Sequence, residues 1–126
     1  MDDNYPIFEC EEIYRTVSNC KVLLADEVNK NDFNENEFSI FHLNIRSLRK
    51  NFVSLQALLH RLSVTFSIIV LTEIWLSEFY DVDFNLDGYR SFSLYRDKNG
   101  GGIKMYVRNC IDCMIIDQMT FVGNFF

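Results

Sequence analysis

Residues 67–75 read SIIVLTEIW and decide the fold that we expect. A continuous apolar run, rich in β-branched residues and bounded by polar segments, predicts a strand that is buried on both faces of a sheet. Glu73 stands at its end, with no lysine or arginine near it along the chain. Burial penalises such a charge unless it is paired. The carboxylate therefore needs either a distant basic side chain, in a structural ion pair, or a divalent cation.

The segment before this run predicts a strand followed by a helix. Residues 38–44, FSIFHLN, alternate as a strand does, with aromatic and β-branched side chains. From Ser47 onward the spacing changes to steps of three and four, which is typical of an amphipathic helix that Ser47 or Asn51 could cap. The apolar stripe consists of Leu48, Phe52, Leu55, Leu59 and Leu62. The order strand, helix, strand predicts a crossover between parallel strands.

A hairpin is predicted after this unit. Residues 89–96, YRSFSLYR, and 103–109, IKMYVRN, both alternate, and an Asn-Gly pair lies between them. The inward-facing side chains predicted in the first run are Tyr89, Phe92 and either Leu94 or Tyr95; those that share a face in the second are Ile103, Met105 and Val107. Residues 110–116, CIDCMII, predict a final strand. The three glycines do not form a phosphate-binding loop, because no Gly-Lys-Ser/Thr and no helix follow them.

The composition, 48% hydrophobic and 24% charged, is that of a globular protein, and its net charge of −6 is unevenly distributed. Residues 1–37 hold ten acidic and three basic residues, whereas residues 38–126 hold eight and nine. We therefore predict an acidic leader or linker over 1–37, with at most one helix around Cys10 to Val28, and a folded domain over 38–126.

Membrane and metal-thiolate classes are not favoured. No run approaches the roughly 18 apolar residues of a membrane span, and the acidic start is unlike a signal peptide, so we expect a cytoplasmic or nuclear location. The four cysteines are predicted to be free thiols. Cys110 and Cys113 have the spacing of half a zinc site, but Cys10 and Cys20 do not supply the other half.

Two polar side chains are expected to meet at one edge of the sheet. Asn44 ends the first predicted strand and Glu73 ends the second, and the carboxyl ends of parallel strands gather ligands in α/β sheets. An amide beside a carboxylate suits a hard cation with a bound phosphate. Alternatively, Asn44 caps the next element and Glu73 is half of a buried ion pair. The pattern alone leaves both interpretations open.

Three segments in this order carry a resemblance to a known family: SIFHLNIRSLRKNFVSLQALL, IIVLTEIWLSE and LDGYRSFSLYRDKNGGGIKMYVRN. From Phe38 to Ile116 the chain resembles the first half of the endonuclease domain of non-LTR retrotransposons of the Jockey type. That domain belongs to a reverse transcriptase polyprotein and is similar to apurinic/apyrimidinic (AP) endonucleases of the endonuclease/exonuclease/phosphatase superfamily. The resemblance implies an α/β fold: a partial DNase I-like αββα sandwich, about half of the full domain.

The resemblance also implies roles for particular residues. Asn44 falls on the Asn that organises the metal and the scissile phosphate, Glu73 on the ligand of Mg²⁺ or Mn²⁺, and Arg96 on a contact to the DNA backbone. Ile74 stands where the family usually has Thr, and Lys104 where it has a small residue. We expect Ile74 to matter little and Lys104 to face solvent.

The later motifs of the family, an active-site Tyr, an Asp-x-Asn pair and a Ser-Asp-His, do not follow these three segments in the sequence. His42 and His60 are expected to be structural residues. We therefore predict a fragment of a Mg-dependent DNA endonuclease that lacks activity alone, because phosphodiester hydrolysis needs nucleophile, metal and leaving group handled together. The alternative is a non-catalytic remnant of a mobile element that acts at most as a binding fragment.

A half-domain also has consequences for association. Its sheet lacks the second sheet that the rest of the domain supplies, so an apolar face should remain uncovered and favour self-association. A second possibility is that residues 1–37 fold back over this face. Only the apolar pieces YPIF and VLLA support it. DNA and the remainder of the domain are the expected partners.

Overall fold

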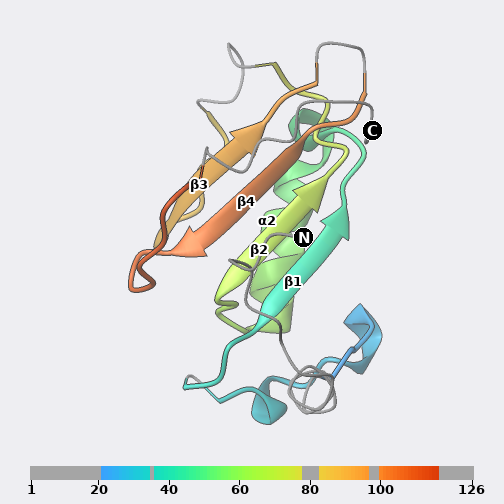
Figure 1. Ribbon diagram of the computed structural model, residues 1–126. Helices are drawn as coiled ribbons and strands as arrows, with labels where there is room; N and C mark the ends of the chain where they lie inside the picture. Colours follow the sequence, from blue (N-terminus) through green and yellow to red (C-terminus); the bar gives the residue numbers. More distant parts are fainter. Residues whose placement is uncertain (1–20, 35, 78–82, 97–99, 117–126) are drawn as a thin grey trace, which may run out of the picture.

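The computed structural model describes residues 21–34, 36–77, 83–96 and 100–116. They form one mixed four-stranded sheet in the order β1-β2-β4-β3, with a single long helix, α2, against one face (Figure 1). The elements are β1 (Ile40–Asn44), α2 (Leu48–Leu62), β2 (Ile68–Thr72), β3 (Tyr89–Leu94) and β4 (Ile103–Arg108). Both strands and the helix of the predicted crossover, and both strands of the hairpin, are therefore present.

The strand pairing confirms the predicted topology. β1 and β2 are parallel, with Asn44 opposite Thr72, and α2 connects them. β4 runs antiparallel to both β2 and β3, so that Ile103 lies opposite Thr72 on one side and Leu94 on the other. The ends of β1, β2 and β3 and the start of β4 consequently meet at one end of the sheet. We call this end, residues 44–47, 72–75, 94–96 and 100–103, the rim.

The helix α2 has defined ends. The Oγ atom of Ser47 accepts a hydrogen bond of 3.2 Å from the backbone N–H of Lys50, which confirms Ser47 as the N-cap. Ser63 ends the helix in the left-handed conformation, φ 55°. The buried residues of the helix are Leu48, Leu55 and Leu62, all from the predicted stripe.

The core lies between α2 and one face of the sheet. Its buried residues are Ile45, Leu48, Leu55, Leu62, Phe66, Ile69, Leu71, Ile74, Leu76 and Tyr106. Two tyrosines bring their hydroxyl groups into hydrogen bonds with backbone carbonyls, Tyr89 with Phe66 (2.6 Å) and Tyr106 with Phe84 (2.7 Å). These bonds satisfy polar atoms that would otherwise be costly to bury.

The opposite face of the sheet is less covered. In β2, Ile69 and Leu71 are buried against α2, whereas Ile68 and Val70 on the other face are only partly buried. The prediction that residues 67–75 are buried on both faces is thus wrong within the described part of the chain, where no second layer of helix or strand packs there. This open face carries Ile40, Ile68, Val70, Phe92, Leu94, Ile103, Met105 and Val107, of which only Val107 is buried.

The expectation that Lys104 faces solvent is wrong. Its side chain is only 2% exposed, and its Nζ atom donates a hydrogen bond of 3.2 Å to the Oγ atom of Ser93 and lies 5.4 Å from the centre of the Tyr106 ring. The register explains the error, because pairing with Leu71 places Lys104 on the α2 side of the sheet. The three predicted apolar partners in β4, Ile103, Met105 and Val107, do share a face, but it is the open face.

At the end of β3 the structure decides whether Leu94 or Tyr95 faces the core. Leu94 is 72% exposed, whereas Tyr95 packs against the core together with Tyr89. Phe92 is partly buried, on the open face. Strand alternation alone could not say which face the helix covers.

The final strand predicted over residues 110–116 is not formed, and a turn follows β4 instead. Cys110 and Cys113 in this segment are exposed free thiols, as expected. Cys10 and Cys20 lie outside the described residues. A thiolate metal site therefore gains no support from the described part of the chain.

The acidic segment contains two short 3-10 turns, Ala25–Glu27 and Lys30–Asp32, and its described part shows no α-helix. The VLLA piece at residues 22–25 is exposed and covers nothing, and the YPIF piece lies outside the described residues. Phe33 does make a core contact, edge-on to Phe66 at 5.8 Å between ring centres. In Figure 1 this segment lies beyond the start of β1, at the end of the sheet opposite the rim.

Candidate functional site

The rim brings the three predicted site residues to one end of the sheet. Asn44 is the last residue of β1, Glu73 follows the last residue of β2, and Arg96 lies two residues after β3. Strand pairing makes their proximity a property of the topology, as expected for parallel strand ends. The side chains of Asn44 and Glu73 do not contact each other by a hydrogen bond, although the structure describes both residues.

Backbone hydrogen bonds continue past the ends of the strands and connect the segments of the rim. The N–H of Ser47 donates to the carbonyl of Glu73 at 2.9 Å, which joins the β1–α2 turn to the segment after β2. The N–H of Trp75 donates to the carbonyl of Gly101 at 3.0 Å, which joins that segment to the β3–β4 loop. The three connections of the rim are therefore fixed to one another.

Strained backbone is concentrated at the rim. Among the described residues, five other than glycine have positive φ, and four of them are rim residues: Arg46 (47°), Ser47 (85°), Glu73 (55°) and Trp75 (54°). The fifth, Ser63, is the C-cap of α2. Each such residue costs about 1–2 kcal/mol, and clusters of this kind are typical of functional sites.

The carboxylate of Glu73 is held by two neutral donors. Its Oε2 atom accepts a hydrogen bond of 2.8 Å from the indole Nε1–H of Trp75 and another of 2.8 Å from the backbone N–H of Gly101. The bond from Trp75, and next that from Gly101, lower the pKa of the Glu73 carboxyl below its ordinary value of 4.5. The charges of Arg96 and Arg46 act in the same direction. Glu73 is therefore ionised at neutral pH.

This arrangement corrects one of the two interpretations of Glu73. The carboxylate is not a deeply buried half of an ion pair, because the residue is partly exposed and its bonded partners are an indole and a backbone amide. Its second oxygen, Oε1, receives no hydrogen bond from any described residue. An ionised oxygen of this kind suits a hard cation. The same two bonds also fasten the β3–β4 loop to β2, which is a structural role.

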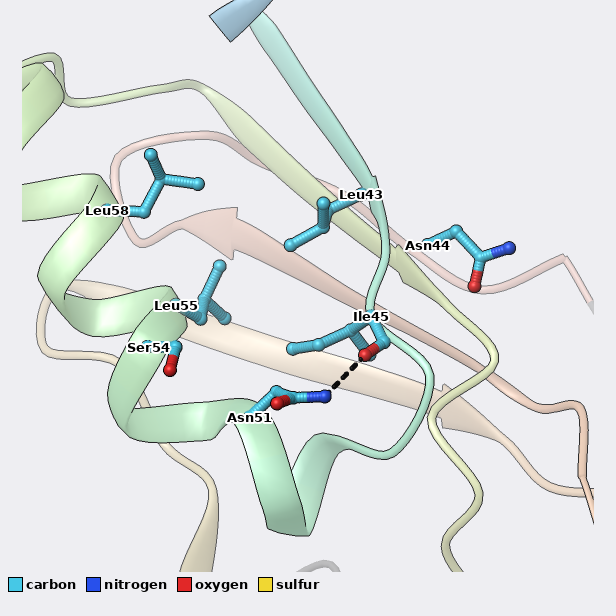
Figure 2. Close-up of a pocket in the computed structure, with 7 residues that line it drawn as sticks. All are labelled: Leu43, Asn44, Ile45, Asn51, Ser54, Leu55 and Leu58. Carbon is cyan, nitrogen blue, oxygen red and sulfur yellow. Dashed lines mark hydrogen bonds between the residues drawn. The ribbon is translucent and has the colours of Figure 1, made fainter.

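A small open pocket of about 180 Å³ lies beside Asn44, between β1 and α2 (Figure 2). Leu43 and Ile45 point toward Leu55 of α2, whereas the side chain of Asn44 points away from the helix. Asn51, the other predicted capping residue, is not the N-cap. Instead, its Nδ2 atom donates hydrogen bonds to the carbonyls of Ile45 (2.9 Å) and Arg46 (3.1 Å), and so holds the turn after β1. The pocket is mainly apolar and carries no charged group.

Metal-binding and acid–base groups are few in the described residues. No set of three or more His, Cys, Asp or Glu side chains there could hold a metal ion. His42 is exposed, with its Nε2 atom 3.4 Å from the Oγ1 atom of Thr72, and His60 is exposed on α2. Neither histidine forms a hydrogen bond with Glu73. Among the described residues, no helix has the length and apolarity needed to cross a membrane.

Sequence reasoning missed three residues that define the environment of Glu73. Trp75 and Gly101 bond its carboxylate directly, and Arg46 contributes charge. Trp75 is the only tryptophan, two residues from Glu73, and this was the available signal. In a regular strand that spacing would also place both side chains on one face.

Comparison with known proteins identifies solved structures with a similar fold. No protein-family model and no curated protein matches the chain. A crystal structure of the AP endonuclease LMAP from Leishmania major is similar over 82% of this chain and 36% of that one, at 18% identity and a TM-score of 0.54. A structure of the 3′ phosphatase NExo from Neisseria, bound to a product DNA hairpin, is similar over 57% and 28%, at 23% identity and a TM-score of 0.49.

The predicted fold class is confirmed by the first of these structures. The helix and mixed four-stranded sheet correspond to part of a DNase I-like fold. The chain spans about a third of the length of the solved structures it matches. At these identities the likeness concerns the fold alone.

Proposed function

We propose that this chain is part of a divalent-cation-dependent phosphodiesterase that acts on DNA, of the non-LTR retrotransposon endonuclease type. The observation that carries the proposal is the ionised carboxylate of Glu73, which leaves Oε1 available at the carboxyl end of the parallel strands. A fold shared with an AP endonuclease supports it. Residues 38–126 form the nuclease part, and residues 1–37 form an acidic leader.

In this proposal the rim residues have distinct roles. Glu73 binds Mg²⁺ or Mn²⁺ through a carboxylate oxygen, and Mg²⁺ commonly uses one or two protein carboxylates together with substrate phosphates. Asn44 orients the scissile phosphate with its amide, and Arg96 contacts the DNA backbone. The bound cation supplies charge neutralisation and a Lewis acid for the phosphoryl oxygen.

The described residues do not amount to a complete hydrolytic site. They offer one carboxylate at the rim, and neither described histidine is bonded to it. A general base and further ligands are needed to handle water and the leaving group. The proposal therefore includes that this chain alone binds the cation weakly and does not cleave DNA, and that elements outside it complete the site.

A second candidate, a non-catalytic binding fragment, is favoured by the open face of the sheet, whose apolar side chains are only partly covered. The two candidates differ at Glu73. A binding fragment that uses the open face needs no ionised carboxylate at the rim.

The experiment that separates them is a titration with Mn²⁺, followed by loss of the electron paramagnetic resonance signal of the free ion. Wild-type protein is compared with Glu73→Gln and with Glu37→Gln, an exposed glutamate before β1 at the other end of the sheet. We expect binding by the wild type and by Glu37→Gln, and its loss in Glu73→Gln. Equal binding by all three proteins would contradict the proposed ligand. Plasmid nicking by the purified chain in Mg²⁺ would contradict the proposed inactivity.

A further inference from the structure

Trp75 is an exposed aromatic side chain at the rim. It is the only tryptophan of the chain, and 51% of it is accessible to solvent. A large aromatic ring contributes most to stability when it is buried, and this ring instead presents half of its surface to solvent at the candidate site.

The ring does not hang freely into solvent. Its Nε1–H is bonded to Glu73 at 2.8 Å, and the backbone N–H of Trp75 is bonded to the carbonyl of Gly101 at 3.0 Å. Gly100 lies close to the ring, since a Cβ atom built there would be 3.7 Å from Nε1. The backbone of Trp75 has φ 54°, which is costly for a bulky residue. The bond to Glu73 holds the indole by its N–H, and the bond to Gly101 holds its backbone.

Two arginines belong to the rim. The side chain of Arg96 lies against Gly101, the residue whose carbonyl is bonded to the backbone of Trp75, since a Cβ atom built at Gly101 would be 2.5 Å from Cδ of Arg96. Arg46 lies in the turn after β1, and the charges of both arginines act on the Glu73 carboxylate. Glu73 offsets one of the two charges. A fixed aromatic surface with neighbouring guanidinium groups is the combination that binds single-stranded nucleic acid, where bases stack on the ring and cations neutralise the backbone.

We propose that Trp75 is a stacking surface for an unpaired base of single-stranded DNA. The proposal rests on the proposed action on DNA and narrows it to a substrate with an unstacked base at the rim. Stacking uses the face of the ring, which every base can contact, so it confers no strong sequence preference. The indole N–H remains engaged with Glu73 while the ring face is used.

Two measurements test this role in buffer with EDTA, so that no metal contributes. The first is quenching of the intrinsic fluorescence of Trp75 by oligo(dT). The second is the anisotropy of fluorescein-labelled oligo(dT) with wild type, Trp75→Ala, Trp75→Phe and Phe38→Ala. Phe38, 64% exposed just before β1 at the far end of the sheet, is the matched control. Circular dichroism shows whether each variant is folded.

We expect saturable quenching and a loss of affinity in Trp75→Ala of about 5- to 150-fold, the range that corresponds to stacking of one base. Trp75→Phe keeps a ring and should bind within a few fold of wild type, as should Phe38→Ala. If Trp75→Ala does not fold, stacking is tested by two results: saturable quenching of the wild-type fluorescence, and an affinity of Trp75→Phe within a few fold of wild type.

The outcomes separate this inference from the proposal on which it rests. Unchanged affinity in Trp75→Ala without quenching, or equal losses in the Ala and Phe variants, would overturn stacking but leave action on DNA intact. Absence of any binding to oligo(dT) and to duplex DNA by the wild type would overturn both.

Discussion

Replacing Gly102 with alanine tests how tightly the rim is built. Gly102 has φ 86°, and a Cβ atom there would lie 2.8 Å from Cγ1 of Ile74 and 3.2 Å from the carbonyl oxygen of Leu94. Ile74 is fully buried, so it cannot move away into solvent. Gly88 is the matched control, because it has φ 85° and no heavy atom within 4 Å of such a Cβ.

The expected magnitude follows from two separate costs. Left-handed strain of about 1–2 kcal/mol applies to alanine at both positions. Overpacking against Ile74 adds about 1–3 kcal/mol at Gly102 alone. We therefore expect the free energy of unfolding to fall by about 2–5 kcal/mol in Gly102→Ala and by about 1–2 kcal/mol in Gly88→Ala. The smaller entropy of the unfolded chain with alanine affects both variants and cancels in their difference.

Equilibrium unfolding in urea, followed by circular dichroism, gives both free energies. A Gly102→Ala variant no less stable than Gly88→Ala would refute the close packing between the β3–β4 loop and Ile74. The same loop positions the N–H of Gly101 on Glu73, so the result bears directly on the candidate site.

Three further predictions concern charge, the turn after β1 and the open face. The folded-state pKa of Glu73 is depressed, so its ionised form stabilises the protein above pH 4.5, and this stabilisation is lost as the pH falls through the folded pKa. The melting temperatures of wild type and Glu73→Gln should therefore differ at pH 7 and converge in acid. Asn51→Ala removes two hydrogen bonds to the turn and should cost about 1–2 kcal/mol in urea unfolding, whereas Gln56→Ala, exposed on the same helix, should stay within about 0.5 kcal/mol. Self-association through the open face should weaken in Val70→Lys, and sedimentation profiles that depend equally on concentration in variant and wild type would argue against that surface.

Local patterns were sufficient for the elements of this fold. The stripe that includes Leu48 and Leu55 predicted α2, and the Asn-Gly pair predicted the β3–β4 hairpin, because both depend on residues close in the sequence. The parallel pairing of β1 and β2 followed from their connection through a helix.

Faces were harder to predict than elements. Ile103 and Lys104 alternate correctly, but alternation does not say which of the two faces meets the helix. The structure buries the charged residue, because the long apolar stem of Lys104 can lie in the core while its Nζ atom reaches Ser93. The expectation for Lys104, that its charged side chain faces solvent, favoured the opposite face.

The candidate site was predictable in position and not in detail. Asn44, Glu73 and Arg96 reach one rim because strand ends meet there, which the topology dictates. The bonds of Glu73 to Trp75 and Gly101 depend on left-handed backbone at all three residues, which no periodicity in the sequence predicts. Conformations of this kind arise from contacts between distant segments.

Cation binding at Glu73 can be observed directly by NMR with Mn²⁺. The single indole N–H of Trp75 gives one signal, and this group is bonded to the Glu73 carboxylate. We expect small additions of Mn²⁺ to broaden this signal and that of the Gly101 amide first, and expect the effect to vanish in Glu73→Gln. Broadening that begins instead in the acidic segment at residues 26–37, with the Trp75 signal unchanged, would show that the cation does not bind at Glu73.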